Sequence, residues 1–252
     1  MDVYAPPYQT TDDITVLVAE ICEEIERISV LQKDHITPKH KKENLICTIH
    51  STLAIENNSL SMSQVTAICE GKRVLGNPVE VREVKNTYDA YKLLPELNPL
   101  DVDSLLKVHS LMMAGLIPDN GKFRSQGVGV FNGEKIIHLA PPAALVPSQV
   151  HNLISWYKES NLHPLIKSAV FHYEFEFIHP FADGNGRVGR MWHTLLLGKW
   201  KEPFYWLPID ALILSRRQEY YSAFNQANNT ADSACFVELL FEIIRDTLKR
   251  FC

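Results

Sequence analysis

Residues 177–190 read Phe-Ile-His-Pro-Phe-Ala-Asp-Gly-Asn-Gly-Arg-Val-Gly-Arg, and this stretch sets the expectations for the whole chain. The apolar pattern before it predicts a helix that ends near Ile178, and a second helix is expected to begin near Gly186. Gly184 and Gly186 allow backbone N–H groups to approach an anion closely, and a helix start adds unpaired donors and a positive dipole end. The stretch therefore predicts two helices joined at an anion site.

The side chains of the same stretch are suited to phosphate chemistry. Arg187 and Arg190 lie three positions apart, so they project from the first turn of the second helix and can pair with phosphate oxygens. Asp183 is a hard oxygen ligand of the kind that Mg²⁺ prefers, and His179 can accept a proton from an attacking hydroxyl. Together they predict phosphoryl or nucleotidyl transfer.

The same residues fit two other patterns less well. Residues 184–189 match the G-x-G-x-x-G pattern of dinucleotide folds, but the flanking patterns predict helices in place of repeated strand–helix–strand units. A metal hydrolase using His172, His179 and His193 lacks a recognised ligand spacing. Taken singly, a histidine before proline or a Gly-Asn-Gly turn is usually structural, so the functional interpretation depends on their coincidence.

The rest of the chain is predicted to be all-α with one small β-hairpin. Asn132-Gly133 supplies the turn of a hairpin at 128–139, because both residues tolerate the positive φ angles of a type I′ turn. Asn98-Pro99 is the best internal boundary, which divides the chain into a helical region 1–98 and a core 99–252. Helices are expected from about Thr11 and at 38–56, 79–94, 101–114, 148–157, 164–178, 186–197, 215–228 and 233–250.

Composition narrows the function classes. The 252 residues are 46% hydrophobic and 22% charged, which is typical of a globular protein with a sizeable core. The net charge of −5 gives no bulk attraction to nucleic acid or anionic lipid, and no long apolar run predicts a membrane span. Five widely spaced cysteines and an N-terminus unlike a signal peptide indicate reduced thiols and a cytoplasmic location.

Residues 179–190 resemble the signature of the Fic family, H-x-F-x-[DE]-G-N-G-R-x-x-R, with every defining position filled. The resemblance extends over about 100–228 and implies a Fic-type helical bundle with the hairpin as a flap. Family members mostly transfer AMP from ATP, with Mg²⁺, to Ser, Thr or Tyr hydroxyls of proteins. The resemblance implies that His179 is the base and that Asp183 is a Mg²⁺ ligand. It also implies phosphate contacts from Gly184, Asn185, Gly186, Arg187 and Arg190, of which Arg190 holds the γ-phosphate.

The resemblance also implies two regions for recognition. Residues 220–228 are similar to the family segment that receives adenine, with Tyr221 near the ring and Asn228 within hydrogen-bonding distance. The hairpin resembles the flap on which a target protein docks by β-pairing, where Phe131, Ile136 and Ile137 could contact an apolar segment. From the residues alone, a tyrosine pair on a helix could equally be core packing and the hairpin a structural ribbon.

Residues 52–57, Thr-Leu-Ala-Ile-Glu-Asn, are similar to the family's inhibitory motif [ST]-x-x-x-E-[GN]. Thr52 and Glu56 share a helix face, and the Glu56 carboxylate could pair with Arg190 in the position of the γ-phosphate. Asn57 completes the motif. The resemblance thus implies a protein adenylyltransferase that Glu56 holds inactive. Removal of AMP by the same site and a nucleotide-gated binding module stay as alternatives, and a homo-oligomer is possible.

Overall fold

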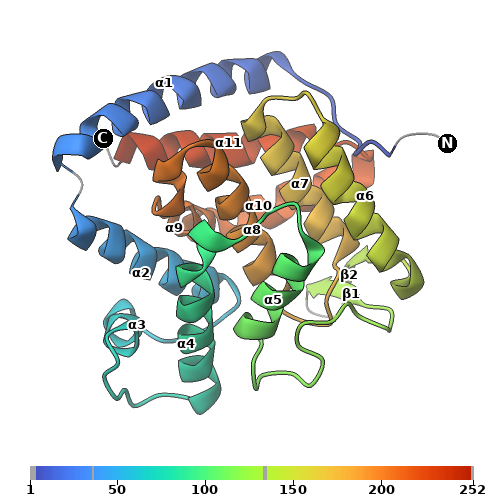
Figure 1. Cartoon of the computed structure of the whole chain (residues 1–252). Coiled ribbons are helices and arrows are strands. Elements are labelled where there is room, and N and C mark those ends of the chain that lie inside the picture. Colours follow the sequence, from blue (N-terminus) through green and yellow to red (C-terminus); the bar gives the residue numbers. More distant parts are fainter. Residues whose placement is uncertain (1–3, 36, 133–134, 251–252) are drawn as a thin grey trace.

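The computed structural model describes residues 4–35, 37–132 and 135–250, with the side chains of 31–35 and 129–139 outside the description. Helices pack around a central pair in this part of the chain (Figure 1). The α-helices are α1 (Asp12–His35), α2 (Pro38–Ile55), α3 (Met62–Cys69), α4 (Pro78–Lys92), α5 (Val102–Met112), α6 (Val146–Glu159), α7 (Pro164–Ile178), α8 (Asn185–Trp200), α9 (Ile209–Ser215), α10 (Arg217–Thr230) and α11 (Ala234–Arg250). Short 3₁₀ turns lie at Leu94–Glu96, Ala143–Leu145 and Glu202–Tyr205. The predicted all-α fold is confirmed.

Helices α7 and α8 form the centre of the molecule. Apolar side chains cover α7 on nearly all sides, which is typical of a helix with neighbours all round it. One of its faces contributes Phe171 and Phe175 to a core shared with α5, α6 and α8, and the other contributes Val170 and Tyr173 to a core shared with α10 and α11. Because α7 lies between two cores, the loop that follows it is anchored on both sides.

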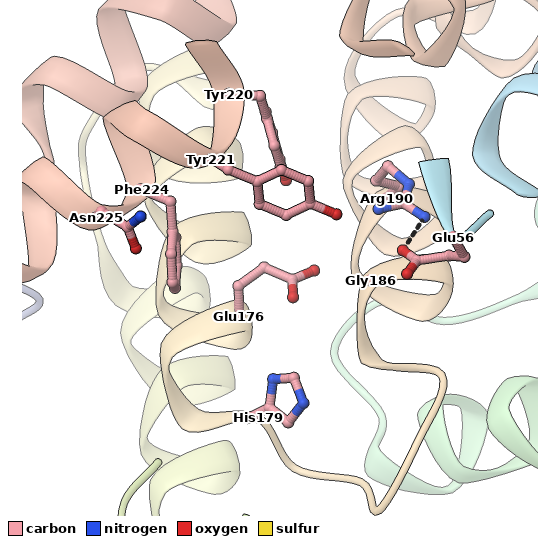
Figure 2. A pocket seen from close by; sticks show the side chains of 9 residues that line it. All are labelled: Glu56, Glu176, His179, Gly186, Arg190, Tyr220, Tyr221, Phe224 and Asn225. Atoms are coloured by element: carbon pink, nitrogen blue, oxygen red, sulfur yellow. Dashed lines mark hydrogen bonds and ion pairs between the residues drawn. The ribbon is translucent and has the colours of Figure 1, made fainter. Parts of the chain in front are cut away.

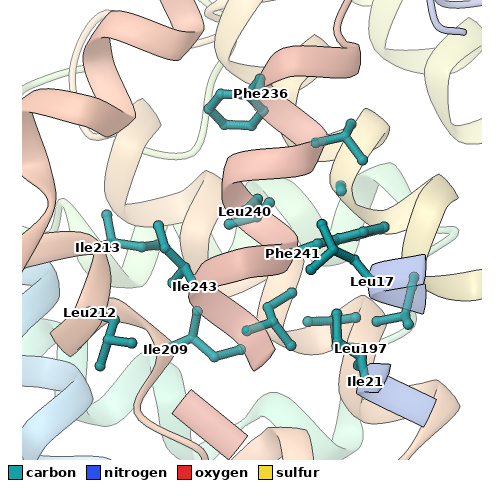
Figure 3. Close-up of a cluster of buried hydrophobic side chains, with 14 of the residues drawn as sticks. Leu17, Ile21, Leu197, Ile209, Leu212, Ile213, Phe236, Leu240, Phe241 and Ile243 are labelled. Carbon is teal, nitrogen blue, oxygen red and sulfur yellow. The ribbon is translucent and has the colours of Figure 1, made fainter. Parts of the chain in front are cut away.

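Helix α1 packs along α11, so the two ends of the chain share one core. Leu17 and Ile21 from α1 lie with Phe241 from α11 and Leu197 from α8 in a single buried cluster (Figure 3). The amphipathic pattern of both helices explains this pairing, since each buries one apolar face. The division at residues 98 and 99 stays a prediction, and the core containing α1 crosses it.

Helices α2, α3 and α4 form a smaller core of their own, with Ile49, Leu53 and Val84 buried between them. Helix α3 is absent from the sequence-based prediction because it has only eight residues, too few for a clear period. Its start is nevertheless encoded, since the Ser61 hydroxyl accepts from the Gln64 N–H and the Gln64 side chain accepts from the Ser61 N–H. Helix α9, with seven residues, is absent from the prediction for the same reason.

Two short strands, β1 (Gly129–Asn132) and β2 (Lys135–Leu139), pair antiparallel in the region of the predicted hairpin. Their register shifts between Val130 and Phe131, and β2 lies against α10. The side chains of Phe131, Ile136 and Ile137 lie outside the described part, so their role stays a prediction. Among the helices described, none is both long and apolar enough to cross a membrane.

Candidate active site

The loop after α7 begins at His179, whose φ of 50° is left-handed and ends the helix. Pro180 cannot continue a helix, so the chain turns away at this point. Arg124, which is buried, fixes the turn from outside: its Nε donates to the carbonyl of His179 at 2.7 Å and its Nη2 to those of Ile178 at 3.2 Å and Pro141 at 2.6 Å. The guanidinium therefore sets where the imidazole leaves the backbone.

A clamp within the loop holds Phe181 in the core. The Asn185 side chain accepts from the Phe181 N–H and donates to the Phe181 carbonyl, both at 2.8 Å. His109 stacks on the Phe181 ring, with 3.7 Å between the ring centroids. Its Nδ1 accepts from the Gly121 N–H at 2.8 Å, so Nε2 carries the proton and donates to the Asp183 carbonyl at 3.0 Å. The side chain of Asn185, a predicted phosphate contact, is thus engaged in shaping the loop.

The two predicted anion-binding glycines lie at the start of α8, where a side chain would not fit. Gly184 has a φ of 83°, and a Cβ there would lie 2.7 Å from the sulfur of Met113. A Cβ on Gly186 would lie 2.5 Å from Oε1 of Glu56 and 2.9 Å from Nη1 of Arg190. A carboxylate from α2 therefore lies over the backbone at the N-terminus of α8, which is a position that favours anions.

Arg190 is buried and connects α8 to α2. Its Nη2 donates to Oε1 of Glu56 at 2.7 Å and to the Thr52 carbonyl at 3.0 Å, and its Nε donates to the Thr52 hydroxyl at 2.9 Å. Burial alone would lower the pKa of Arg190, but Glu56 and Asp210 outweigh it and hold that pKa raised. Burial would raise the pKa of Glu56, but Arg190 reverses this effect and the pKa is lowered. The pair is therefore charged at neutral pH.

The end of α2 directs Glu56 toward this guanidinium. Glu56 caps the helix, and Asn57 follows with a φ of 68°. The Asn57 N–H donates to the Ala54 carbonyl and the Asn58 N–H to the Leu53 carbonyl, each at 3.0 Å, which is the Schellman arrangement. Asparagine tolerates the left-handed region better than most residues, which explains its place after the glutamate.

Arg187 and Asp183 form a second charged cluster beside the first. Arg187 Nη1 pairs with Glu83 of α4 at 3.1 Å, and its Nη2 approaches Oδ1 of Asp183 at 3.4 Å. The Asp183 side chain is 61% exposed, and its Oδ2 takes no part in these contacts. One open carboxylate beside a phosphate site suits Mg²⁺, which usually takes one or two protein ligands with phosphate oxygens and water.

A cavity of about 120 Å³ opens beside these groups (Figure 2). Arg190, Gly186 and Glu56 lie at one end, the side chains of Phe224 and Asn225 at the other, and His179 below. Tyr220, Tyr221 and Glu176 complete the wall. The cavity thus has a cationic end at a helix start, which suits an anionic group, and an aromatic, amide-bearing end, which suits a planar ring.

Comparison with known proteins shows which protein family this chain belongs to. Residues 99–197 match the Fic/DOC family. The crystal structure of a Fic family protein from Desulfovibrio desulfuricans is 46% identical and superposes with a TM-score of 0.95, covering 98% of this chain and 76% of that one. The chain belongs to the Fic family.

More distant Fic proteins extend the comparison. Protein adenylyltransferase fic-1 of Caenorhabditis briggsae is 28% identical over 233 residues, which cover 88% of this chain and 44% of that protein. The chain therefore spans less than half the length of such curated relatives. The structure of Caenorhabditis elegans Fic-1, at 24% identity and a TM-score of 0.77, shares the fold.

Most of the site residues predicted for this Fic protein line the cavity or lie beside it. His179, Gly186, Arg190, Glu56 and Tyr221 line it. Asn228 does not: its side-chain oxygen accepts from the Tyr173 hydroxyl at 2.8 Å, so its contact with adenine stays a prediction. Asn57 does not line the cavity either, and its side-chain oxygen accepts from Arg217 at 3.0 Å.

Sequence reasoning did not find four groups that shape the site. Phe224 and Asn225 line the aromatic end, and their positions three and four residues after Tyr221 could have indicated this shared face. Glu176 lines the cavity from a helix that otherwise looks apolar. Asp210, buried on α9, lies 3.8 Å from Arg190 and has no signal in the local sequence.

Neither alternative interpretation fits the structure. The residues before Gly184 are the helix α7 and a loop, not a strand, so the rejection of a dinucleotide fold is confirmed. His172 and His193 stack with 5.3 Å between ring centroids, and Nε2 of His172 lies 2.6 Å from the Tyr220 hydroxyl. Within the described ranges, no three His, Cys, Asp or Glu side chains gather as metal ligands do.

Proposed function

We propose that this Fic chain is a protein adenylyltransferase that moves AMP from ATP to a hydroxyl of a target protein, and that Glu56 holds it inactive. The main support is the Glu56 carboxylate, which lies 2.7 Å from Arg190 and over Gly186. An anion from the chain itself thus occupies a buried guanidinium at a helix N-terminus, where a phosphate would be favoured. Homology to Fic adenylyltransferases supports the choice of AMP as the transferred group.

The residues of the loop and of the start of α8 would have separate roles in such a transfer. His179 would take the proton of the target hydroxyl as its oxygen attacks the α-phosphorus and pyrophosphate leaves. The N–H groups from Gly184 to Gly186, with Arg187 and Arg190, would hold the phosphates. Asp183 would hold Mg²⁺, which neutralises charge on the phosphates when bound. Arg124 and the Asn185 clamp keep the loop in shape without approaching the reacting atoms.

Inhibition follows from competition for one cation. Arg190 cannot pair fully with both the Glu56 carboxylate and a γ-phosphate, because both would lie over Gly186. ATP that binds beside an intact Glu56 would have its phosphates displaced from the orientation needed for in-line attack. Removal of the carboxylate would return Arg190 to the phosphates.

The Glu56→Gly variant tests the proposal. Incubated with labelled ATP, Mg²⁺ and a cell lysate, it should incorporate at least about tenfold more AMP than the unchanged protein. Adding His179→Ala should abolish this incorporation. A matched control is Glu70→Gly, because Glu70 also caps a helix but lies away from the cavity. Equal labelling by Glu56→Gly, Glu70→Gly and the unchanged protein would refute the proposal.

The target is proposed to dock on the ribbon of β1 and β2. A strand edge can pair with an extended segment, and β2 lies against α10, which carries Tyr221. A second cavity of about 320 Å³, lined by residues between Asp119 and Val128 and by Ala182, continues from the ribbon to the loop. A target segment lying there would present its hydroxyl beside the loop.

Removal of AMP is a second candidate, because Glu56 and His179 line the same cavity. A carboxylate in this position could orient a water toward an AMP-modified side chain. Incubation of a pre-modified target without ATP or pyrophosphate separates the two activities: a hydrolase releases AMP and loses this activity in Glu56→Gly, whereas a chain that is only a transferase releases none. ATP binding without turnover in Glu56→Gly would instead indicate a nucleotide-gated binding module.

A further inference from the structure

The Glu176 carboxyl lies in the middle of the cavity, a position that neither the motif nor the inhibitory contact explains. It projects from the last turn of α7, with Phe224 and Asn225 on one side and Arg190 and Gly186 on the other (Figure 2). His179 lies below it and the Tyr221 ring above it. The carboxyl therefore stands between the aromatic end and the cationic end.

The described chain leaves one oxygen of this carboxyl unsatisfied. Oε1 of Glu176 is buried and has no hydrogen-bond partner in the described part. Burial raises the pKa of Glu176 to about 7; Arg190 opposes the rise and Glu56 adds to it. Oε1 is sealed against Gly189, so only the rest of the carboxyl can meet a molecule in the cavity, and a hydrogen-bond donor from that molecule would offset part of the free-energy cost of burying the group.

Helix α8 leaves room for the carboxyl. A Cβ on Gly189 would overlap Oε1 of Glu176 and lie 3.0 Å from the Phe175 ring. Glycine in the middle of a helix costs about 0.5–1 kcal/mol relative to alanine, so this position is kept small at a cost to helix stability. The space that it leaves is the space that the carboxyl occupies.

The order of groups along the cavity identifies which part of a nucleotide faces Glu176. The base is expected between the rings of Tyr221 and Phe224, and the phosphates at Gly186 and Arg190. The ribose joins these two parts, so it lies in the middle. Phosphate oxygens accept hydrogen bonds and repel a carboxylate, whereas the two ribose hydroxyls donate. The hydroxyls are therefore the matching partners.

We propose that Glu176 accepts a hydrogen bond from the ribose hydroxyls of the bound nucleotide and thereby makes the site select ribonucleotides over deoxyribonucleotides. This inference depends on the proposed function only in placing ATP in the cavity. Glu176 is then a specificity-determining residue, while the chemistry of AMP transfer stays with the loop.

The test compares ATP with 2′-deoxy-ATP and 3′-deoxy-ATP in the Glu56→Gly background. With Glu176 present, kcat/KM should favour ATP by about tenfold or more over at least one deoxynucleotide, the usual effect of losing a hydrogen bond to a charged group. In Glu176→Ala the preference should fall below about threefold, mainly through KM. Glu176→Gln, whose amide oxygen still accepts, should lie between the two.

Glu174→Gln is the matched control, since Glu174 lies on the same helix but accepts from the Tyr4 hydroxyl outside the cavity. It should leave the preference unchanged. An equal preference with and without the Glu176 carboxyl would overturn the inference, provided that thermal melting shows both proteins folded. Equal use of all three nucleotides with Glu176 intact would do the same.

Calorimetric titration separates this inference from the proposed function. If no variant transfers AMP, the proposed function fails, but the difference in Kd between ATP and the deoxynucleotides still reports on Glu176. Loss of that difference in Glu176→Ala would support the inference without any turnover. Failure of ATP to bind the Glu56→Gly protein at all would overturn it.

Discussion

Replacing Thr52 by valine removes one hydroxyl and almost no volume, at a point where two charged groups depend on that hydroxyl. Arg190 Nε donates to it at 2.9 Å, and Thr52 is fully buried. Burial raises the pKa of Asp210, and Arg190 and a hydrogen bond from Thr52 oppose this rise. The hydroxyl thus accepts from a guanidinium and donates to a carboxyl, and valine can do neither.

These contacts determine how much the free energy of unfolding should fall in the Thr52→Val variant. A hydrogen bond to a charged group contributes about 1.5–3 kcal/mol, and the two losses overlap because they share one hydroxyl. The free energy of unfolding should therefore fall by about 3 kcal/mol. For a chain of this size, each kcal/mol lowers Tm by about 2–4 °C, so a shift of about 6–12 °C is expected.

The assay is urea unfolding without nucleotide, followed by circular dichroism. Thr48→Val is the matched control, because Thr48 lies one turn earlier on α2, is also buried, and only donates to the Asn44 carbonyl at 3.1 Å. It should cost less than about 1 kcal/mol. The Thr52 variant should also incorporate more AMP than the control, since α2 is then held less firmly against Arg190.

Equal unfolding midpoints for the Thr52 and Thr48 variants would refute this reasoning. That result would mean that the Thr52 contacts with Arg190 and Asp210 contribute no net free energy to the fold. A lower midpoint without any rise in AMP incorporation would keep the energetic argument but show that α2 is held against the site by Glu56 alone.

Two further predictions concern the walls of the site. Burial raises the pKa of Glu176 from 4.5 to about 7, so between these two pH values the carboxyl is ionised in the unfolded chain but still protonated in the folded one. The free energy of unfolding therefore falls as pH rises from 4.5 to about 7. The Glu176→Gln variant lacks this titration, so its free energy of unfolding should exceed that of the unchanged protein by about 1–3 kcal/mol between pH 5 and 8. Urea unfolding measures this difference, and a difference that does not vary with pH would contradict the prediction. Arg124→Lys should lower AMP transfer in the Glu56→Gly background by about tenfold, because one ammonium cannot replace a fork that binds the carbonyls of His179, Ile178 and Pro141. Arg82→Lys, at an exposed contact with the Gly115 carbonyl, is its control, and equal rates in the two variants would count against a positioning role for Arg124.

The sequence predicts the structure where neighbouring residues determine it, and does not where contacts between distant residues determine it. Long periodic segments such as α7 and α11 follow from their apolar patterns, whereas α3 and α9 are too short to show a period. The segment 179–190, which comprises the loop after α7 and the start of α8, could be predicted because its chemistry is concentrated in consecutive residues. Glu56 came from a resemblance, since 134 positions separate it from Arg190.

Glu174 and Glu176 show why the rest could not be predicted. Both stand in the same apolar helix, two residues apart, and nothing in the local sequence distinguishes them. Glu174 accepts from Tyr4 at the N-terminus of the chain, while Glu176 faces the cavity. Which glutamate serves the site depends on how α7 is rotated against α8 and α10, and that rotation is set by the packing of the whole core.

The sharing of Arg190 between α2 and the candidate nucleotide site has a thermodynamic consequence for regulation. Suppose that a triphosphate displaces the Glu56 carboxylate and so destabilises the last turn of α2. A molecule that stabilises this turn must then lower the affinity for the triphosphate, and the triphosphate must lower the affinity for that molecule by the same factor. Amide hydrogen exchange at the end of α2 should therefore speed up on saturation with nucleotide. A molecule that separates α2 from α9 would then raise nucleotide affinity without touching the cavity, so under this proposal the packed contact between these two helices is the place where regulation would act.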